Sequence, residues 1–222
     1  GYGSARILDK LDYDYIESHP KLVVFFSDVT ALQIALWEKC RLVTANGPLM
    51  VTLGGSDAYT AGPFFQGLTT DAWRGPLALP AGRKLTTVVP GQAEGPIVGG
   101  TLTVLTSLVG TPYALDGTGC ILVLEDTGED AYRIDRMLTQ LWQSGLLSRV
   151  AAIAYGDFTD CPNDPGDFTT DQVLDYYAHL AGKPAIKGLP VGHTTDKAFV
   201  PYGVKVRLDA DREGASLTFI AG

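Results

Sequence analysis

Three uninterrupted runs of apolar residues most constrain what this chain can fold into. They are Leu22–Phe26, Ile121–Leu124 and Val150–Tyr155. Each run has the length of a strand, and an unbroken apolar strand is typical of a parallel sheet that is covered on both faces. The sequence therefore predicts an α/β fold whose central strands are buried.

Segments with helical character follow these predicted strands. Apolar residues from Ala31 to Lys39 have helical spacing, and Ala131–Gln143 is amphipathic. A further helix is expected over Thr170–Ala181, where Gly182 supplies the C-terminal cap. The tail, residues 203–220, alternates between apolar and polar residues, which indicates antiparallel strands.

A stretch rich in Gly, Pro, Thr and Ser, residues 54–95, divides the chain. We place a domain boundary inside it, near residue 75, which gives domains of residues 1–75 and 76–222. The first 50 residues contain only two apolar strand segments, and a covered parallel sheet needs more strands than that. We therefore expect that further strands come from residues outside this sequence, or that this half is incompletely folded by itself.

Composition argues against several classes of function. The formal net charge is −8, and an acidic protein repels phosphate backbones, so no nucleic-acid partner is expected. No apolar run approaches the roughly 20 residues of a membrane helix, so no membrane partner is expected either. The three cysteines, Cys40, Cys120 and Cys161, are widely spaced, and no metal-ligand motif accompanies them. Reduced thiols in a cytosolic protein explain this pattern better than a disulfide framework does.

Ser27 is the first candidate for chemistry. It lies between a buried strand and a helix, which is the setting of a nucleophile elbow. There the helix N-terminus brings free backbone N–H groups close to a developing oxyanion. The surrounding residues lack the glycines of the G-x-S-x-G pattern, so on local sequence alone a helix N-cap is the favoured role.

Glu125 and His193 are the other two candidates. Glu125 follows an apolar strand, at the end of the strand where function is usual in open α/β sheets. The alternative is a solvated acidic turn before the next helix. His193 follows Pro190 and Gly192, which fix a particular turn, and histidine is the usual base for activating a serine. The alternative is an ordinary loop histidine.

Taken together and in order, these segments resemble the LD-carboxypeptidase family of serine peptidases, which includes muramoyltetrapeptide carboxypeptidases and microcin C7 self-immunity proteins. The resemblance spans nearly the whole chain, and it reverses the local preference for the non-catalytic alternatives. It is carried by eight segments: 1–6 (Gly-Tyr-Gly-Ser-Ala-Arg), 26–32, 46–48, 95–102, 110–113, 121–126, 132–138 and 192–193.

The resemblance implies a role for each site residue. Ser27 would be the nucleophile, His193 the general base and then acid, and Glu125 the carboxylate that orients the imidazole. The backbone N–H of Asp28 would form part of the oxyanion hole, and the turn at Gly1 would add a second donor. The implied fold is a Rossmann-like N-terminal domain that carries the serine. The implied C-terminal domain is mixed α/β with a swivelling β-barrel-like character, and the site lies between the two domains.

The implied reaction is hydrolysis of the L,D bond before the terminal D-alanine of a murein tetrapeptide. It would proceed through an acyl-enzyme and need no metal and no cofactor. Members of the family are commonly cytoplasmic homodimers that act in peptidoglycan recycling.

Four departures from the family pattern bear on these expectations. Phe25 stands where a glycine is usual, Thr101 where asparagine is usual and Asn46 where histidine is frequent. The family also has an N-terminal segment with the first strands of the sheet, before the glycine turn at Gly1. We therefore expect the chain to be a fragment, a cleaved form or one half of a split protein.

Two other functions remain open at the level of sequence. One is a same-family immunity hydrolase that cleaves a toxic aminoacyl-nucleotide. It would need an aromatic platform for the base, for which Trp73 and Trp142 are candidates. The other is a catalytically inactive binding or assembly module left by truncation.

Overall fold

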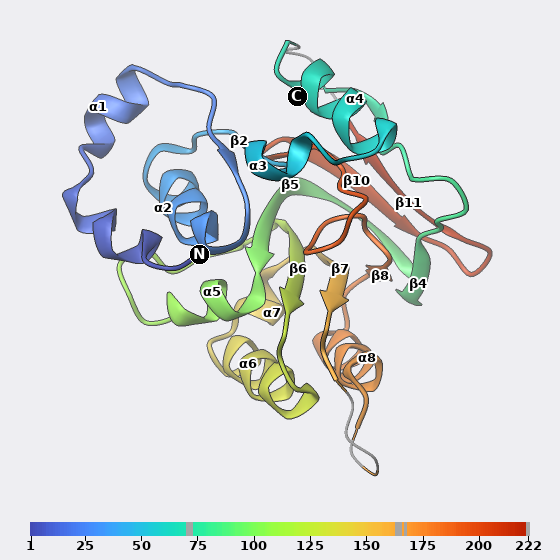
Figure 1. Cartoon of the computed structure of the whole chain (residues 1–222). Helices are drawn as coiled ribbons and strands as arrows, with labels where there is room; N and C mark the ends of the chain where they lie inside the picture. The colour runs from blue at the N-terminus through green and yellow to red at the C-terminus, as the bar shows by residue number, and fades with distance from the viewer. Residues whose placement is uncertain (70–72, 163–165, 167, 221–222) are drawn as a thin grey trace.

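The structure is a computed structural model that describes residues 1–69, 73–162, 166 and 168–220. It is a mixed α/β fold with two sheets, one of three strands and one of eight (Figure 1). Within the described residues, none of the helices has the length and apolar character needed to span a bilayer.

The three-stranded sheet combines segments from both ends of the chain. Its order is β1 (Val24–Phe25), β2 (Thr44–Asn46) and β9 (Val200–Tyr202). β1 and β2 are parallel, whereas β9 is antiparallel to β2. β1 is shorter than the apolar run predicts, because the run begins outside the sheet and Leu22 is exposed. The participation of β9 is what brings the C-terminal half of the chain against Ser27.

Helices pack around this small sheet. The connection from β1 to β2 is α2 (Thr30–Cys40), where Ala31, Ile34 and Ala35 are fully buried. η1 (Ser4–Lys10) and α1 (Tyr13–Ser18) precede the sheet and pack on α2. The helix predicted from Ala31 to Lys39 is therefore present.

The eight-stranded sheet has the order β3-β11-β10-β5-β6-β7-β8-β4, and its four central strands are parallel. These strands are β5 (Gly91–Thr101), β6 (Ile121–Thr127), β7 (Ala152–Thr159) and β8 (Ala185–Lys187). The helices that connect them are α5 (Leu102–Ser107), α6 (Ala131–Gln143), α7 (Leu146–Arg149) and α8 (Thr170–Ala181).

Antiparallel strands complete the large sheet at both edges. They are β3 (Gly75–Pro76), β4 (Thr86–Val89), β10 (Lys205–Ala210) and β11 (Ala215–Phe219). The two antiparallel strands predicted in the tail are β10 and β11. The barrel-like character of this domain and the boundary near residue 75 stay predictions.

One helix lies directly before the stretch rich in Gly, Pro, Thr and Ser, residues 54–95, and a second lies within it. They are α3 (Met50–Leu53) and α4 (Ala58–Gly67), and α4 contains Pro63. The Asp57 carboxylate starts α4 by accepting a hydrogen bond from the backbone N–H of Thr60 at 2.9 Å. Glycine and proline in this segment conceal the helix at the level of sequence.

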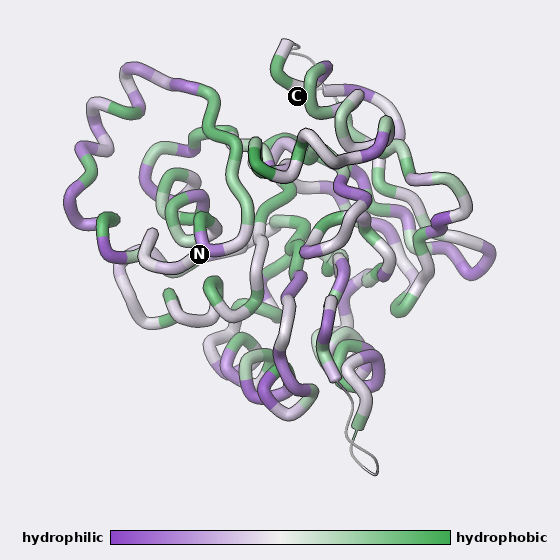
Figure 2. Tube along the Cα trace, viewed as in Figure 1, coloured by the Kyte–Doolittle hydropathy of each residue, from purple (hydrophilic) through white to green (hydrophobic). Residues whose placement is uncertain are grey.

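The core fills both faces of the large sheet. One apolar cluster joins the parallel strands to α2, α5, α6 and α8, and a second lies under β9, β10 and β11. In Figure 2 hydrophobic and hydrophilic residues alternate along α6 and α8. Such alternation places their apolar stripes on the sheet.

Two glycines at the end of β5 allow this strand to approach β6 and α2 closely. Gly99 and Gly100 have φ values of 133° and 138°. A Cβ on Gly99 would lie 2.0 Å from the carbonyl oxygen of Val123, and one on Gly100 would lie 2.5 Å from the Thr30 hydroxyl. Glycine is required because any side chain would push β5 away from β6 or α2.

Candidate active site

Ser27 lies at the junction between β1 and the short helix η2 (Ser27–Val29). Its φ is +56°, which is unusual for a residue other than glycine and costs of order 1–3 kcal/mol. The described residues supply no side-chain cap to the N-terminus of η2 or α2. The N-cap alternative for Ser27 is therefore wrong, and the sharp turn directs its hydroxyl to His193.

Glu125 is held at the carboxyl end of β6 and is 2% exposed. Its Oε2 lies 2.9 Å from Nδ1 of His193. Its Oε1 accepts a hydrogen bond from the hydroxyl of Thr101 at 2.5 Å. The alternative of a solvated acidic turn is wrong for Glu125, because both of its carboxylate oxygens have partners inside the protein.

Asp126, next to Glu125, points its carboxylate toward the start of α5. It accepts hydrogen bonds from the backbone N–H and hydroxyl of Thr103 at 2.8 and 2.7 Å, and from the N–H of Thr127 at 2.8 Å. Burial raises the pKa of Asp126, although these hydrogen bonds lower it. Adjacent carboxylates therefore serve different purposes: Glu125 contacts His193, and Asp126 fixes α5 to β6.

His193 is on a loop that is tied to the large sheet. The backbone N–H of Asp157 in β7 donates to the carbonyl of Val191 at 2.8 Å. The Arg83 guanidinium donates to the Asp157 carboxylate at 2.6 Å and to the carbonyl of Gly188 at 2.8 Å. These contacts fix the path of the loop on the N-terminal side of His193 and so help to define the position of its imidazole.

The imidazole of His193 joins the other two candidates. Its Nε2 lies 2.9 Å from the Ser27 hydroxyl oxygen, and its Nδ1 lies 2.9 Å from Glu125. When Nδ1–H donates to the carboxylate, Nε2 is left as an acceptor for the serine proton. The structure thus brings together three residues that are far apart in sequence, in an arrangement that can activate a hydroxyl for nucleophilic attack.

The two predicted oxyanion donors lie in different surroundings. Asp28 follows Ser27 in η2, and its carboxylate accepts a hydrogen bond from the backbone N–H of Ser4 at 2.8 Å. The Ser4 hydroxyl donates to the carbonyl of Asp28, so η1 is fixed against the nucleophile turn. Gly1 is exposed. No contact in the described part of the chain tests either oxyanion assignment, and both stay predictions.

The three residues that differ from the family pattern, Phe25, Asn46 and Thr101, are all buried. Phe25 is 1% exposed, and its ring meets the Tyr202 ring edge-on at 5.2 Å. Asn46 is buried at the end of β2, where it pairs with Val200 in β9. Thr101 binds Glu125, so the residue that replaces the usual asparagine is itself part of the site.

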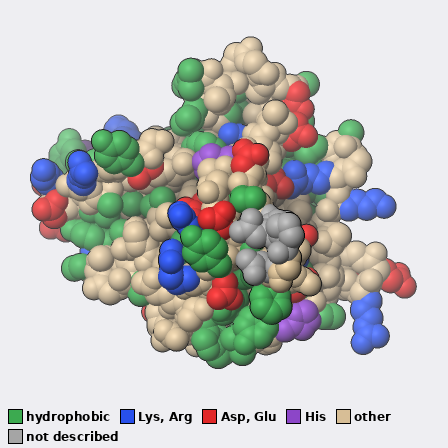
Figure 3. All heavy atoms as spheres, turned by 60° about the horizontal axis from the view of Figure 1, so that its bottom comes forward, with side chains coloured by type: hydrophobic (Ala, Val, Ile, Leu, Met, Phe, Trp, Pro, Cys, Tyr) green, Lys and Arg blue, Asp and Glu red, His purple; other side chains and the backbone are tan. Residues whose placement is uncertain are grey.

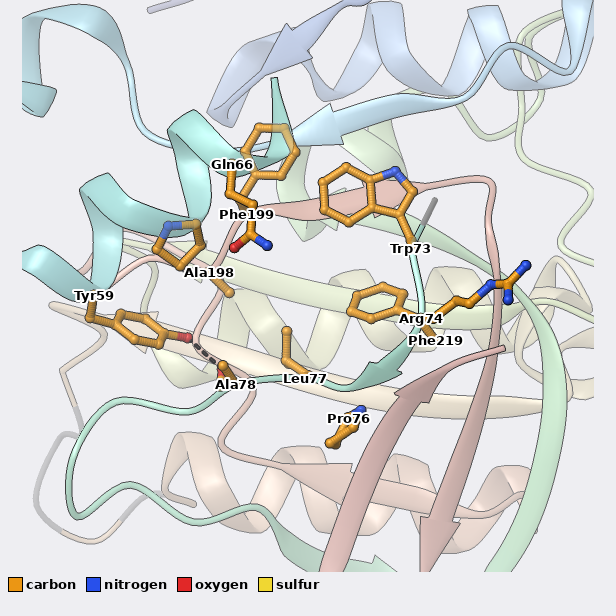
Figure 4. Close-up of a pocket in the computed structure, with 11 residues that line it drawn as sticks. Tyr59, Gln66, Trp73, Arg74, Pro76, Leu77, Ala78, Ala198, Phe199 and Phe219 are labelled. Atoms are coloured by element: carbon orange, nitrogen blue, oxygen red, sulfur yellow. Dashed lines mark hydrogen bonds between the residues drawn. The ribbon is translucent and has the colours of Figure 1, made fainter. Parts of the chain in front are cut away.

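The two tryptophans proposed as aromatic platforms lie outside the Ser27–Glu125–His193 group. Trp73 stacks on Phe199, with ring centroids 5.4 Å apart and an interplanar angle of 23°. It lines a pocket of about 200 Å³ with Arg74 (Figure 4). Of the described residues that line this pocket, none is Ser27, Glu125 or His193. Trp142 is partly buried on α6 against the main core.

Two parts of the site are not evident from motifs. The Thr101 contact with Glu125 forms only because β5 and β6 are neighbours in the sheet. The ion pair between Arg83 and Asp157 likewise forms only after folding has brought β7 next to the loop that carries Arg83. Lys197 is a buried lysine beside the Phe26 ring. Its position directly before the apolar run Ala198-Phe199-Val200 is the one signal in the sequence that could have indicated it.

Comparison with known proteins gives a consistent family. The profile of the LD-carboxypeptidase N-terminal domain matches residues 1–47, and that of the C-terminal domain matches residues 94–208. A probable murein peptide carboxypeptidase of Bacillus subtilis is 36% identical over 97% of this chain and 68% of its own length. The murein tetrapeptide carboxypeptidase of Pseudomonas aeruginosa is 31% identical over 96% of this chain and 71% of its own length.

A solved structure agrees with these sequence matches. The crystal structure of muramoyltetrapeptide carboxypeptidase from Oxalobacter formigenes superposes with a TM-score of 0.84 at 30% identity. The match covers 100% of this chain and 76% of that one. On these sequence and structural matches, the chain belongs to the LD-carboxypeptidase family of serine peptidases.

Proposed function

We propose that the protein is a serine carboxypeptidase that hydrolyses the L,D-peptide bond before the terminal D-alanine of murein tetrapeptides. The observation that carries this proposal is the continuous hydrogen-bonded line from the Ser27 hydroxyl through His193 to Glu125, with both links at 2.9 Å. The murein peptide substrate is taken from the printed names of relatives that are 31% and 36% identical.

In the first half of the reaction, the Ser27 oxygen attacks the carbonyl carbon before D-alanine, and its proton passes to Nε2 of His193. The imidazolium then gives this proton to the leaving nitrogen, D-alanine departs, and the peptide remains as an ester on Ser27. In the second half, His193 takes a proton from water, the resulting hydroxide attacks the ester, and Ser27 recovers its proton. Glu125 keeps the imidazole oriented and stabilises its charged form.

The negative oxygen of each tetrahedral intermediate needs donors. We assign one to the backbone N–H of Asp28, which follows the nucleophile in the short helix η2. We assign the second to the turn that begins at Gly1. The anchoring of Asp28 by Ser4 would hold the first donor still during the reaction.

The immunity-hydrolase alternative has weaker support. A microcin C7 self-immunity protein from Escherichia coli is 27% identical, and neither Trp73 nor Trp142 lies against the triad. No described aromatic contact of these two tryptophans favours a nucleotide substrate over a peptide.

Release of D-alanine from a murein tetrapeptide tests the proposal. We expect turnover by the unsubstituted protein, and a loss of several orders of magnitude in kcat for Ser27→Ala and for His193→Ala. Ser148→Ala, which changes an exposed serine in α7, is the matched control and should keep full activity. Equal rates in Ser27→Ala and Ser148→Ala would contradict the proposal.

A further inference from the structure

Lys197 is buried without a carboxylate partner. The residue is 8% exposed. Within the described part of the chain, no acidic side chain lies within 4.0 Å of its ammonium, whereas seven other lysines and arginines form such pairs. Lysine is almost never buried unless it is paired, because an unpaired ammonium loses its hydration. A buried and unpaired lysine therefore needs an explanation in terms of what it binds.

The ammonium of Lys197 lies over the face of Phe26, the residue directly before the nucleophile. Its Nζ is 3.8 Å from the centroid of the Phe26 ring, and the same ring lies 4.6 Å from the His193 ring. A cation over an aromatic face is stabilised, but the ring does not neutralise its charge. The Phe26 ring thus contacts both the ammonium and the imidazole.

The backbone on either side of this lysine is fixed. The N–H of Lys197 donates to the Thr60 hydroxyl at 3.0 Å, and the N–H of Ala198 donates to the carbonyl of Pro190 at 2.8 Å. Strand β9 begins three residues later and is paired with β2. Lys197 is therefore presented from a rigid segment, as a binding site requires.

The lysine also lines a pocket beside the His193 loop. This pocket of about 420 Å³ is bounded by Thr194, Thr195 and Lys197 on one side and by residues of the 48–60 segment on the other. Among the described residues that line it, Lys197 is the one basic side chain, and Asp57 and Asp196 are the acidic ones. The Asp57 carboxylate accepts a hydrogen bond from the backbone N–H of Thr60, and that of Asp196 accepts one from the Thr195 hydroxyl. Burial lowers the pKa of the ammonium, while the negative charge of Glu125 raises it.

We infer that the Lys197 ammonium binds the terminal carboxylate of the substrate and so makes the enzyme an exopeptidase, an inference that rests on the proposed function. In a carboxypeptidase the scissile bond is one residue from the terminal carboxylate, so the cation that recognises this carboxylate must lie beside the nucleophile. Arg83 is already engaged by Asp157. An ammonium in partly dehydrated surroundings that pairs with a carboxylate forms a charge-assisted hydrogen bond.

Binding to a protein that cannot turn over the substrate tests this directly. Calorimetric titration of Ser27→Ala would use a murein tetrapeptide ending in D-alanine and the same peptide ending in D-alaninamide. The acid should bind about 10-fold to 100-fold more tightly than the amide. In Ser27→Ala combined with Lys197→Met the two peptides should bind equally. Equal binding in the presence of Lys197, or a preference for the acid that survives Lys197→Met, would overturn the inference.

Steady-state kinetics of variants that retain Ser27 distinguish binding of the carboxylate by Lys197 from a general structural role of this residue. Lys197→Met should raise KM for the acid about 10-fold to 100-fold, leave kcat within a few-fold and leave the slow cleavage of the amide unchanged. Lys197→Arg should recover part of the loss, and Lys10→Met, at an exposed lysine in η1, should change nothing. An equal effect of Lys197→Met on acid and amide would contradict the assignment.

Failure of the proposed function has a different signature. In that case the unsubstituted protein releases no D-alanine from the acid peptide, whereas the comparison of acid and amide binding in Ser27→Ala still decides the role of Lys197. Because acid and amide are compared in one preparation, a fraction of unfolded protein affects both equally and does not change their ratio.

Discussion

The Ser27 turn shows how the site is assembled from single residues. Its φ of +56° places the hydroxyl against His193 rather than on the helix end. The other end of the hydrogen-bonded line is held by Thr101, which donates to the Oε1 of Glu125. The orientation of the imidazole therefore depends on a residue that does not contact it.

Substitutions at Thr101 test this dependence. Thr101→Val removes the hydroxyl and should lower kcat about 10-fold, because the Glu125 carboxylate loses a hydrogen bond worth about 1–1.5 kcal/mol and can turn away from His193. Thr101→Asn, which supplies an amide donor and is the usual residue of the family, should retain most of the activity. Steady-state rates of D-alanine release provide the measurement. Activity in Thr101→Val equal to that of the unsubstituted protein would show that this contact is dispensable.

Glu125→Gln tests the carboxylate itself. The amide can present its NH₂ group to Nδ1 of His193 and so favour the wrong imidazole tautomer, and it cannot stabilise the imidazolium. We expect kcat to fall about 10²-fold to 10⁴-fold with little change in the far-ultraviolet circular dichroism spectrum. A kcat within a few-fold of the unsubstituted value would rule out the role proposed for Glu125.

Strand ends and loops position the triad at the scale of elements. β1 presents Ser27, β6 presents Glu125, and the loop before β9 presents His193. Two local devices keep these elements aligned: the Asp126 carboxylate ties β6 to the start of α5, and Arg83 ties the His193 loop to Asp157. Each device can be removed without touching a triad residue.

Arg83→Met removes the second device. The loop should lose the hydrogen bonds from the guanidinium, and the Asp157 carboxylate should lose its cation, so the free energy of unfolding is expected to fall by about 1–3 kcal/mol. A looser loop should also lower kcat several-fold. Urea denaturation and rates of D-alanine release measure both effects, and Arg212→Met, at an exposed arginine in the β10–β11 turn, is the control. Unchanged stability and kcat would contradict the role of Arg83.

Asp126 predicts a dependence of stability on pH. Burial raises its folded-state pKa above the usual value of 3.8, so at pH values above the folded pKa the folded protein bears the cost of a buried carboxylate. Below pH 3.8 the side chain is protonated in both states and that cost is absent. Asp126→Asn should therefore gain stability relative to the unsubstituted protein as the pH rises from 3 to 6. Denaturation curves at both pH values check the sign, and a constant difference would contradict it.

The sequence is informative for elements whose signals are local. The amphipathic pattern predicts α6 at Ala131–Gln143, and the C-terminal glycine predicts the end of α8 at Ala181. The apolar run Leu22–Phe26 is longer than β1 (Val24–Phe25), because a strand's extent depends on its partner as well as on its own residues. β9 was not predicted, since its pairing with β2 joins segments more than 150 residues apart.

The whole molecule brings together the two ends of the chain. β9 completes the sheet next to Ser27. The long strand β5 pairs with β10 at its start and ends at Thr101, which contacts Glu125 (Figure 1). The order of family motifs was enough to select Ser27, Glu125 and His193, but not the neighbours that only folding brings to them, such as Lys197. The homodimer, the cytoplasmic location and the role in peptidoglycan recycling stay predictions.

The surface of the molecule is chemically mixed. On the face drawn in Figure 3, acidic, basic and hydrophobic side chains are interspersed, and Lys and Arg side chains occur in ones and twos. With a net charge of −8, this face offers no broad basic field for a phosphate backbone.

The most direct test that Ser27 is a nucleophile activated by His193 is mass-spectrometric mapping of the residue that a fluorophosphonate labels. The reagent reacts with a serine only where a base activates it. We predict one label, on the peptide that contains Ser27, which is lost in Ser27→Ala and forms at least 10²-fold more slowly in His193→Ala. A protein that stays unlabelled, or that is labelled equally in Ser27→Ala, would contradict it.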